Sequence, residues 1–190
     1  MRMRNVMTAA LAGLALLGFA SSASASTDLT WPPKDVKPVH KTKAELQKQA
    51  DGFSAHQKKA FPRAFHGATN VAPGNWGGEA EGVFDDMQYM GNWTTFTYQG
   101  KEFQTYTQVN APGFLKQSPK EFCETNTCTG TVSDHRGGVT VYSKLEQFGI
   151  VTARNWRPNG EVVWVQSWTQ GTEKQLAQVA EDRAFTFTKK

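Results

Sequence analysis

The sequence has little of the residues that carry the commonest catalytic and metal chemistry. Its 190 residues include two cysteines and four histidines, and no histidine stands at metal-ligand spacing from another histidine, a cysteine or an acid. Glycine-rich phosphate loops, Walker patterns and dinucleotide fingerprints are also missing. These absences argue against a zinc protein and against a nucleotide-dependent enzyme. We therefore expect no metal and no cofactor.

Long hydrophobic runs are missing except near the N-terminus. There, Ala9 to Ala20 form an apolar stretch, preceded by Arg2 and Arg4 and followed by Ser24-Ala25-Ser26. This is the pattern of a signal peptide cleaved after Ala25, whereas a membrane-spanning helix needs about 20 apolar residues. We predict a signal peptide over residues 1–25 and a secreted protein, extracellular or associated with the cell wall, with no membrane span.

A strong net charge is missing too. The formal charge is +4, of which Arg2 and Arg4 supply two, so residues 26–190 carry about +2. So small a charge does not indicate nucleic acid as a partner. The excess of positive charge lies between Thr27 and His66. It is interpreted either as a basic arm that docks on an acidic surface such as a wall polymer, or as a solvated lysine-rich arm.

The two cysteines, Cys123 and Cys128, are separated by four residues. In an exported chain this spacing favours a disulfide, because two thiols without a nearby histidine pair make only half of a zinc site. The bond would hold residues 124–127 as a tight protruding loop.

The distribution of residue types predicts three parts: the signal peptide, an extended, poorly ordered Pro/Lys-rich arm over residues 26–41, and a single domain over residues 42–190. Thr42 and Glu45 form a capping-box pattern, which predicts a helix from about Lys43 to Gly52 that resumes as far as Ala60. Residues 61–78 are rich in Gly, Pro and Asn and are predicted to be irregular.

Beyond residue 79 the pattern becomes that of β-strands. Strands are predicted over residues 82–90, 93–98, 102–109, 129–132, 139–146 and 184–188, with a hairpin over residues 150–169, a short helical turn from Ser118 and a last helix capped by Thr172. Phe96 and Tyr98 of the 93–98 strand are predicted to share one face with Phe103 and Tyr106 of the 102–109 strand. Strands grouped together with helices at the ends indicate an α+β fold. We expect an antiparallel sheet of about five or six strands with a C-terminal helix packed on one face and an N-terminal helical segment.

The hairpin over residues 150–169 is the most informative stretch. The turn Pro158-Asn159-Gly160 predicts a register in which Arg154 faces Trp164. One face then holds small apolar residues suited to packing under a helix. The other holds the ligand-contact candidates Trp168, Trp164, Trp156, Arg154 and Gln166. Tryptophan stacks on sugar rings and anchors protein interfaces, so this face is either a binding surface or a second core layer. Trp164 is expected to be the more buried, and Trp168 the better candidate for contact.

Catalytic patterns are weak. Ser133-Asp134-His135 resembles a triad only in its letters, because neighbours in sequence do not easily bond in the order nucleophile, base and orienting acid. Asp134, His135 and Arg136 are therefore predicted to form a hairpin tip that could contact a partner. Asp85 or Asp86, paired with Glu79, Glu81 or Glu121, could supply the two carboxylates of a glycosidase.

About residues 123–186 combine the cysteine pair, a strand, the hairpin with its Arg-Pro-Asn-Gly turn, a short helix and an Asp-Arg-x-Phe-Thr ending. This combination resembles a group of small exported proteins associated with high-GC Gram-positive bacteria. The resemblance implies export and an α+β domain, and it carries no activity.

Three functions are compatible with the sequence. The leading hypothesis is an exported non-catalytic binding protein that acts at the cell envelope, on a cell-wall polymer or on another secreted protein. The alternatives are a small extracellular hydrolase acting on wall or polysaccharide, and a secreted protease inhibitor that uses the Cys123–Cys128 loop.

Overall fold

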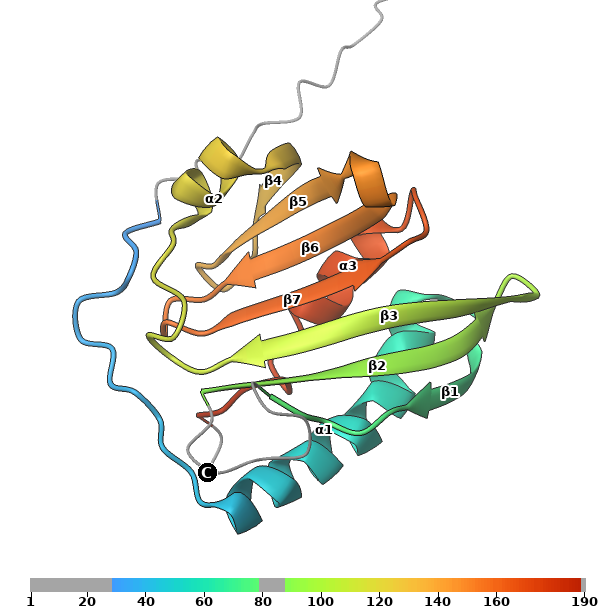
Figure 1. Cartoon of the computed structure of the whole chain (residues 1–190), viewed down its shortest axis with the longest axis horizontal. Coiled ribbons are helices and arrows are strands. Elements are labelled where there is room, and N and C mark those ends of the chain that lie inside the picture. The colour runs from blue at the N-terminus through green and yellow to red at the C-terminus, as the bar shows by residue number, and fades with distance from the viewer. Residues whose placement is uncertain (1–28, 79–87, 189–190) are drawn as a thin grey trace, which may run out of the picture.

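The structure is a computed structural model that describes residues 29–78 and 88–188. In chain order its elements are α1 (Lys43–Ala64), β1 (Thr69–Pro73), β2 (Tyr89–Tyr98), β3 (Lys101–Asn110), α2 (Pro119–Thr125), β4 (Thr127–Ser133), β5 (Val139–Leu145), the 3-10 helix η1 (Glu146–Phe148), β6 (Ile150–Trp156), β7 (Val162–Ser167) and α3 (Glu173–Ala180). The strands form one antiparallel sheet in the order β1-β2-β3-β7-β6-β5-β4. The α+β prediction is confirmed (Figure 1).

The sheet has seven strands in the described residues, not five or six. The additional one is β1, a short edge strand inside the segment that was predicted to be irregular. Its mostly exposed side chains gave no alternation of apolar and polar residues to detect. The predicted strand over residues 82–90 lies largely outside the described residues, and β2 begins at Tyr89.

Turn residues set the register of the two long hairpins. Gly160 has φ 85°, and Arg154 pairs with Trp164 as the turn predicted. In the β2–β3 hairpin, Gln99 and Gly100 both have positive φ, 51° and 73°, which is the conformation of a two-residue type I′ turn. This turn pairs Trp93 with Tyr106. The prediction that Tyr106 shares a face with Phe96, Tyr98 and Phe103 was wrong, because alternation along β3 places Tyr106 and Phe103 on opposite faces of the sheet.

Helix α1 starts at the predicted capping box, in which the Thr42 hydroxyl accepts from the backbone N–H of Glu45. It then runs unbroken for 22 residues, longer than predicted. Gly52 lies on the exposed side, and Pro62 lies in the last turn, where it removes the one backbone hydrogen bond that its position would donate to the carbonyl of Lys58. Buried side chains recur at helical spacing along one stripe: Leu46, Ala50, Phe53, Gln57, Ala60 and Phe61. Packing of this stripe on the sheet outweighs the low helix propensity of Gly52 and Pro62.

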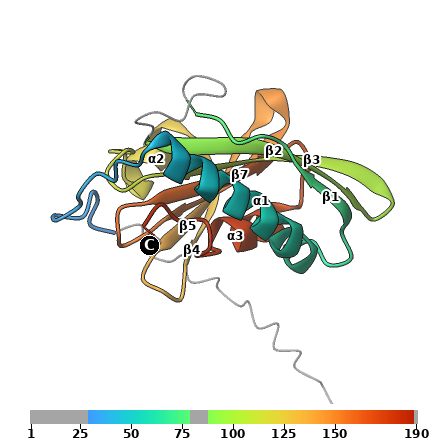
Figure 2. The ribbon, with the colours of Figure 1, turned by 90° about the horizontal axis from the view of Figure 1, so that it is seen from below.

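Helices α1 and α3 cover one face of the sheet, which we call the helix face (Figure 2). The main core lies between these two helices and the sheet, and it includes Val163 and Val165 of β7 and Phe96 of β2. The C-terminal tail also packs here through Phe185 and Phe187. Contrary to prediction, residues 184–188 form no strand. The backbone N–H groups of Phe187 and Thr188 donate to the carboxylate of Glu161 rather than to a neighbouring strand.

Among the described residues, the opposite face, which we call the open face, is covered only at one end. Helix α2 packs there through Phe122, beside Trp156 and Val162. The N-terminal arm adds Leu29 and Trp31, and the indole N–H of Trp31 donates to the carbonyl of Leu115 at 3.0 Å. The described part of the arm therefore packs along the domain (Figure 1), although its composition predicted a poorly ordered segment.

A disulfide joins Cys123 in α2 to Cys128 in β4, as predicted. It ties the covering helix α2 to the edge strand. In the described ranges, no helix has the length and apolar character needed to cross a membrane.

Candidate functional site

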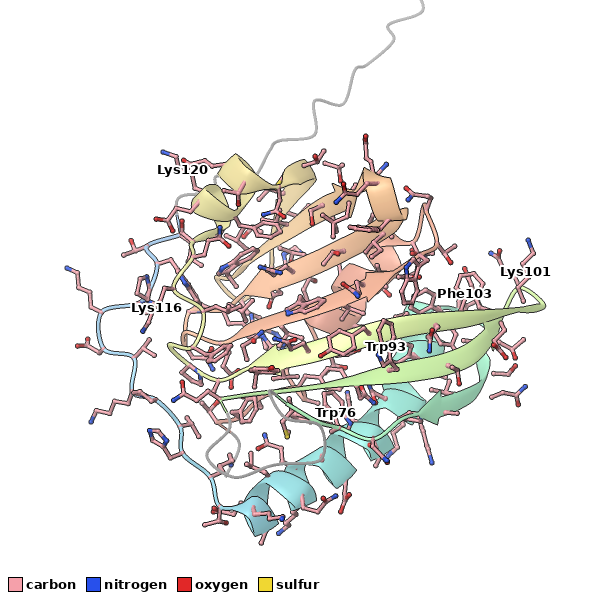
Figure 3. The ribbon with its side chains drawn as sticks, in the orientation of Figure 1. Trp76, Trp93, Lys101, Phe103, Lys116 and Lys120 are labelled. Carbon is pink, nitrogen blue, oxygen red and sulfur yellow. A yellow bond between two sulfur atoms is a disulfide. The ribbon has the colours of Figure 1, made fainter. Side chains whose placement is uncertain are left out.

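Aromatic side chains cross the uncovered part of the open face in a continuous series, which we call the aromatic row. Its members are Trp168, Trp93, Tyr106 and Trp164. Trp168 and Trp93 stack nearly in parallel, 5.0 Å between ring centroids and 12° between planes. The next two steps measure 4.9 Å, from Trp93 to Tyr106, and 5.2 Å, from Tyr106 to Trp164. Figure 3 labels Trp93 on this face of the sheet, in the view of Figure 1.

Strand pairing builds the row from residues distant in sequence. Trp93 of β2 pairs with Tyr106 of β3, and Trp164 of β7 pairs with the next open-face residue of β3, Gln108. A glycine makes room for the phenol ring. A Cβ at Gly91 would lie 2.1 Å from the hydroxyl oxygen of Tyr106, which is closer than any real contact. Gly91 thus allows Tyr106 to lie across β2.

Arg154 of β6 stands at the inner end of the row. Its guanidinium carbon lies 4.3 Å from the ring centroid of Phe122 and 5.6 Å from those of both Trp156 and Trp164. These are cation–π contacts. No hydrogen bond or ion pair joins this guanidinium to any described residue, and its Nε is buried without a partner. Burial lowers the pKa of Arg154 to about 10, so the group stays positively charged at neutral pH.

Side-chain amides and the phenol add polar groups to the row. The Tyr106 hydroxyl donates to Gln108 Oε1 at 3.3 Å, and Gln108 Nε2 donates to Asn110 Oδ1 at 2.7 Å. Burial, with a smaller effect of Tyr89, raises the pKa of Tyr106, which keeps its hydroxyl protonated. The half-buried amide of Gln166, opposite Tyr106, has no hydrogen-bond partner among the described residues. The row therefore offers apolar ring surface beside free donors and acceptors.

The predicted contact residues differ widely in exposure. Trp168 is 47% exposed, Trp164 is half-buried and Trp156 is fully buried under α2. Trp156 therefore belongs to the second core layer and does not reach the surface. Trp93, which is 38% exposed, and Tyr106 were not among the predicted residues. The two-residue turn at Gln99-Gly100 could have identified them, because its register places both Trp93 and Tyr106 on the open face.

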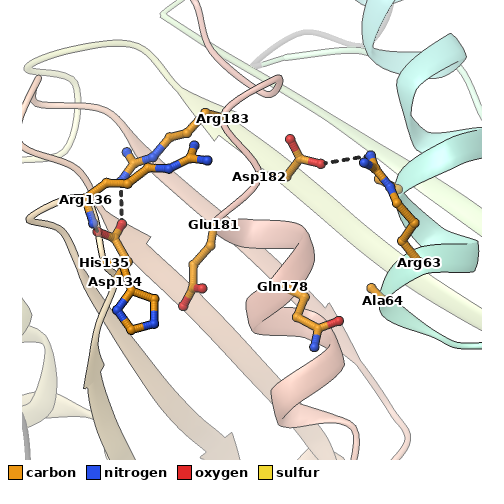
Figure 4. Close-up of a pocket in the computed structure, with 10 residues that line it drawn as sticks. Arg63, Ala64, Asp134, His135, Arg136, Gln178, Glu181, Asp182 and Arg183 are labelled. Atoms are coloured by element: carbon orange, nitrogen blue, oxygen red, sulfur yellow. Dashed lines mark hydrogen bonds and ion pairs between the residues drawn. The ribbon is translucent and has the colours of Figure 1, made fainter.

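A polar cleft of about 480 Å³ lies on the other side of the molecule, between the hairpin tip after β4, the end of α3 and α1 (Figure 4). Asp134, His135 and Arg136 form its rim at the tip. Asp134 is buried, and its carboxylate accepts from the backbone N–H groups of Gly138 at 2.6 Å and Arg136 at 3.0 Å, and also from Arg183. Of the three predicted loop contacts, only His135 and Arg136 are exposed.

The charges of this cleft are mostly bound to one another. Asp134 pairs with Arg183, while Asp182 lies 2.7 Å from Nε2 of His56 and 3.4 Å from Arg63. Figure 4 shows the ion pair of Asp134 on one side of the cleft and that of Asp182 on the other. Burial raises the pKa of Asp182, but hydrogen bonds from Ala184 and His56 bring the net value below its usual range. These pairs hold the end of α3 against α1 and the hairpin tip.

The catalytic candidates are not assembled into a site in the described residues. His56 and Asp182 have the geometry of a base with its orienting acid, but no described Ser, Thr or Cys donates to His56. The carboxylate of Glu121 accepts from the backbone N–H of Ser118 at 2.7 Å and so caps α2. Asp85, Asp86, Glu79 and Glu81 lie outside the described residues. No cluster of His, Cys, Asp or Glu in the described ranges could hold a metal ion.

The Cys123–Cys128 segment is partly helical. Cys123 to Thr125 form the last turn of α2, Asn126 caps it, and β4 starts at Thr127. Glu124 and Thr125 are exposed.

No family model matches the chain, and no curated protein or solved structure is significantly similar to it.

Proposed function

We propose that this protein is an exported, non-catalytic carbohydrate-binding protein that acts at the cell envelope and uses the aromatic row to bind a wall polysaccharide. The observation that carries the proposal is the row itself, four rings across an uncovered sheet face with two indoles about half exposed. Indole rings stack on sugar rings, and a folded monomer rarely leaves such an apolar strip unused.

The spacing of the row supports an extended polymer. Successive groups lie 4.9 to 5.6 Å apart from Trp168 to Arg154, so the row is continuous, as the binding site of an extended ligand requires. The amides of Gln166 and Gln108 lie beside the rings and match the hydroxyl groups of a sugar.

The test compares binding with stability in the same variants. Trp168→Ala and Trp93→Ala should weaken binding to purified wall polysaccharide at least about fivefold, which corresponds to about 1 kcal/mol. Each should lower the free energy of unfolding by only about 1 kcal/mol, because both rings are exposed and lose mainly their mutual stacking. Sedimentation with insoluble polymer measures the first quantity, and a denaturant titration measures the second.

Two control variants frame the result. Phe148→Ala removes another exposed aromatic ring, 62% exposed, from η1, outside the row. It should leave binding unchanged. Trp156→Ala should lower the unfolding free energy by about 3–5 kcal/mol, because that ring is fully buried. If Trp168→Ala and Trp93→Ala bind wall polymers as the wild type does, the proposal fails.

The same purified chain tests the two alternatives. A hydrolase would release reducing ends from the polymer, and loss of the row would then reduce turnover. A protease inhibitor would slow an extracellular protease, and glycine replacement of residues 124–127 would abolish that effect while Trp168→Ala would not. If the ligand is instead a secreted protein, the wild type would capture that protein and not the polymer, and the Trp168→Ala variant would not capture it.

A further inference from the structure

We infer that the polymer bound by the aromatic row is acidic, and that Arg154 binds a carboxylate carried by one of its sugar rings. This inference rests on the proposed function and adds the chemical class of the ligand. The feature that leads to it is a partly buried cation at one end of the aromatic row, without a hydrogen bond or ion pair to any described residue.

Desolvation of Arg154 is not balanced within the described protein. A guanidinium removed from water normally gains hydrogen bonds to carboxylates or carbonyls, and an arginine has five N–H groups to satisfy. Arg154 has none of these bonds among the described residues, and its guanidinium contacts the rings of Phe122, Trp156 and Trp164. Its Nε is buried without a partner. The two terminal nitrogens also lack a partner among the described residues but are not fully buried, so they reach solvent.

The aromatic surroundings also hold the guanidinium in place. Phe122 lies closest, at 4.3 Å from the guanidinium carbon, and Trp164 pairs with Arg154 directly across the strands. A fixed planar fork with free outer nitrogens is suited to bidentate binding of a carboxylate. The next position along the row is Trp164, so a sugar ring lying there would place a ring-borne carboxylate beside the terminal nitrogens.

A hexuronic acid polymer fits both properties. Its rings match the apolar row, and its carboxylate is attached directly to the ring, one step from the guanidinium. A neutral glucan would fill the row but leave Arg154 without an anion.

The test uses pairs of ligands in which the carboxylate is either free or converted to its neutral methyl ester. Oligomers of galacturonate, glucuronate and mannuronate are each compared with their methyl esters by calorimetric titration. We expect at least one acid to bind the wild type roughly tenfold more tightly than its ester, since a charge-assisted hydrogen bond is lost in the ester. Arg154→Gln should abolish this preference and leave the affinity for the ester unchanged. Added salt should weaken binding of the acid and not of the ester.

Two further variants keep the result interpretable. Arg136→Gln removes an equal charge from the exposed hairpin tip, on the side of the polar cleft, and should retain the full preference. Arg154→Lys keeps the charge without the planar fork and should retain part of it. Retention of the full preference in Arg154→Gln would overturn the inference.

The outcome separates this inference from the proposed function. Equal affinity of the wild type for every acid and its ester overturns the role of Arg154 and leaves carbohydrate binding intact. If the wild type binds none of the acids but still binds neutral wall polysaccharide through Trp168, the inference also fails alone. If no saccharide binds at all, the proposed function fails with it.

Discussion

Arg154 and Arg157 lie three residues apart and project to opposite faces of the sheet. Burial lowers the pKa of each to about 10. Arg157, fully buried on the helix face, donates to Asn155, to Glu161 and to the carbonyls of Ala180, Asp182 and Phe185. All five of its N–H groups are thereby used. Arg154, on the open face, has none of these bonds in the described residues.

The difference separates a structural cation from one that is available to a ligand. Arg157 closes the end of α3 and the tail onto β6, and the Glu161 carboxylate beside it accepts from Thr186 and Phe187 of the tail. Arg154 holds no other described segment by hydrogen bonds. The same residue type, with its pKa lowered by burial to about 10 in both places, therefore stabilises the fold on one face and offers free donors on the other.

Arg157→Met should have the largest effect on stability. The change leaves Glu161 buried without its cation and frees three backbone carbonyls, so the free energy of unfolding should fall by about 3–5 kcal/mol. Denaturant titration measures it. The double variant Arg157→Met, Glu161→Gln should lose less than the two single changes together, because no lone charge is left. A loss below about 1 kcal/mol in Arg157→Met would contradict the structural role.

Asp134→Asn should have the second-largest effect on the free energy of unfolding, and this effect should depend on pH. Burial raises the pKa of Asp134, but hydrogen bonds from Asn155, Gly138 and Arg136, together with the charge of Arg183, bring the net value below its usual range. A lowered carboxyl pKa stabilises the fold above the pKa of the unfolded chain, about 3.9, and this contribution disappears as pH falls through the folded value.

The measurement is unfolding at neutral and acid pH. At pH 7 Asp134→Asn should lose about 1.5–3 kcal/mol, the value of a charge-assisted hydrogen bond. The gap between the variant and the wild type should narrow as pH falls below about 4, because Asp134 then binds a proton in the unfolded chain before it does so in the fold. A gap that is constant with pH would show that the charge of Asp134 is not what stabilises the hairpin tip.

Gly91→Ala should disturb the open face. The added methyl group meets the Tyr106 hydroxyl and lies 3.2 Å from the carbonyl oxygen of Thr107, so the ring must move. We expect a loss of about 1–3 kcal/mol in stability, typical of overpacking, together with weaker polysaccharide binding. Gly52→Ala is the matched control, since nothing lies within 4 Å of its Cβ position in α1. It should stabilise the protein by about 0.5–1 kcal/mol and leave binding unchanged.

Arg154→Met should have the smallest effect on stability. Methionine keeps much of the apolar stem and removes an unpaired charge, so the free energy of unfolding should change by less than about 1 kcal/mol, or rise. The same titrations that measure Arg157→Met provide the comparison. Equal losses in the two variants would show that the cation–π contacts of Arg154 stabilise the fold as much as the hydrogen bonds of Arg157 do.

The site was only partly predictable from the sequence. The turn at Pro158-Asn159-Gly160 was sufficient to place Arg154 opposite Trp164, because a tight turn determines the pairing of its own strands. Trp93 and Tyr106 were missed although the Gln99-Gly100 turn implied their pairing. Their contact with Trp164 and Trp168 could not be predicted, because it requires β3 to pair with β7, more than fifty residues away in sequence.

Local sequence determined the features that depend on neighbouring residues. The capping boxes at Thr42 and Ser118, the hairpin turns and the span of the disulfide all follow from hydrogen bonds or bonds over a few residues. Thr172 shows the limit of such patterns, because it occupies the N-cap position of α3 while its hydroxyl donates to the carbonyl of Thr169 instead.

Tertiary structure alone decided which tryptophans are buried and which arginine is paired. Trp156 and Trp168 lie on the same face of the same hairpin, but α2 and Trp31 cover one and leave the other exposed. Arg157 finds its acceptors at the end of α3, whereas the guanidinium of Arg154 contacts aromatic rings and has no acceptor among the described residues. Burial and pairing depend on what distant segments bring to a position, and a single residue in the sequence carries no record of those neighbours.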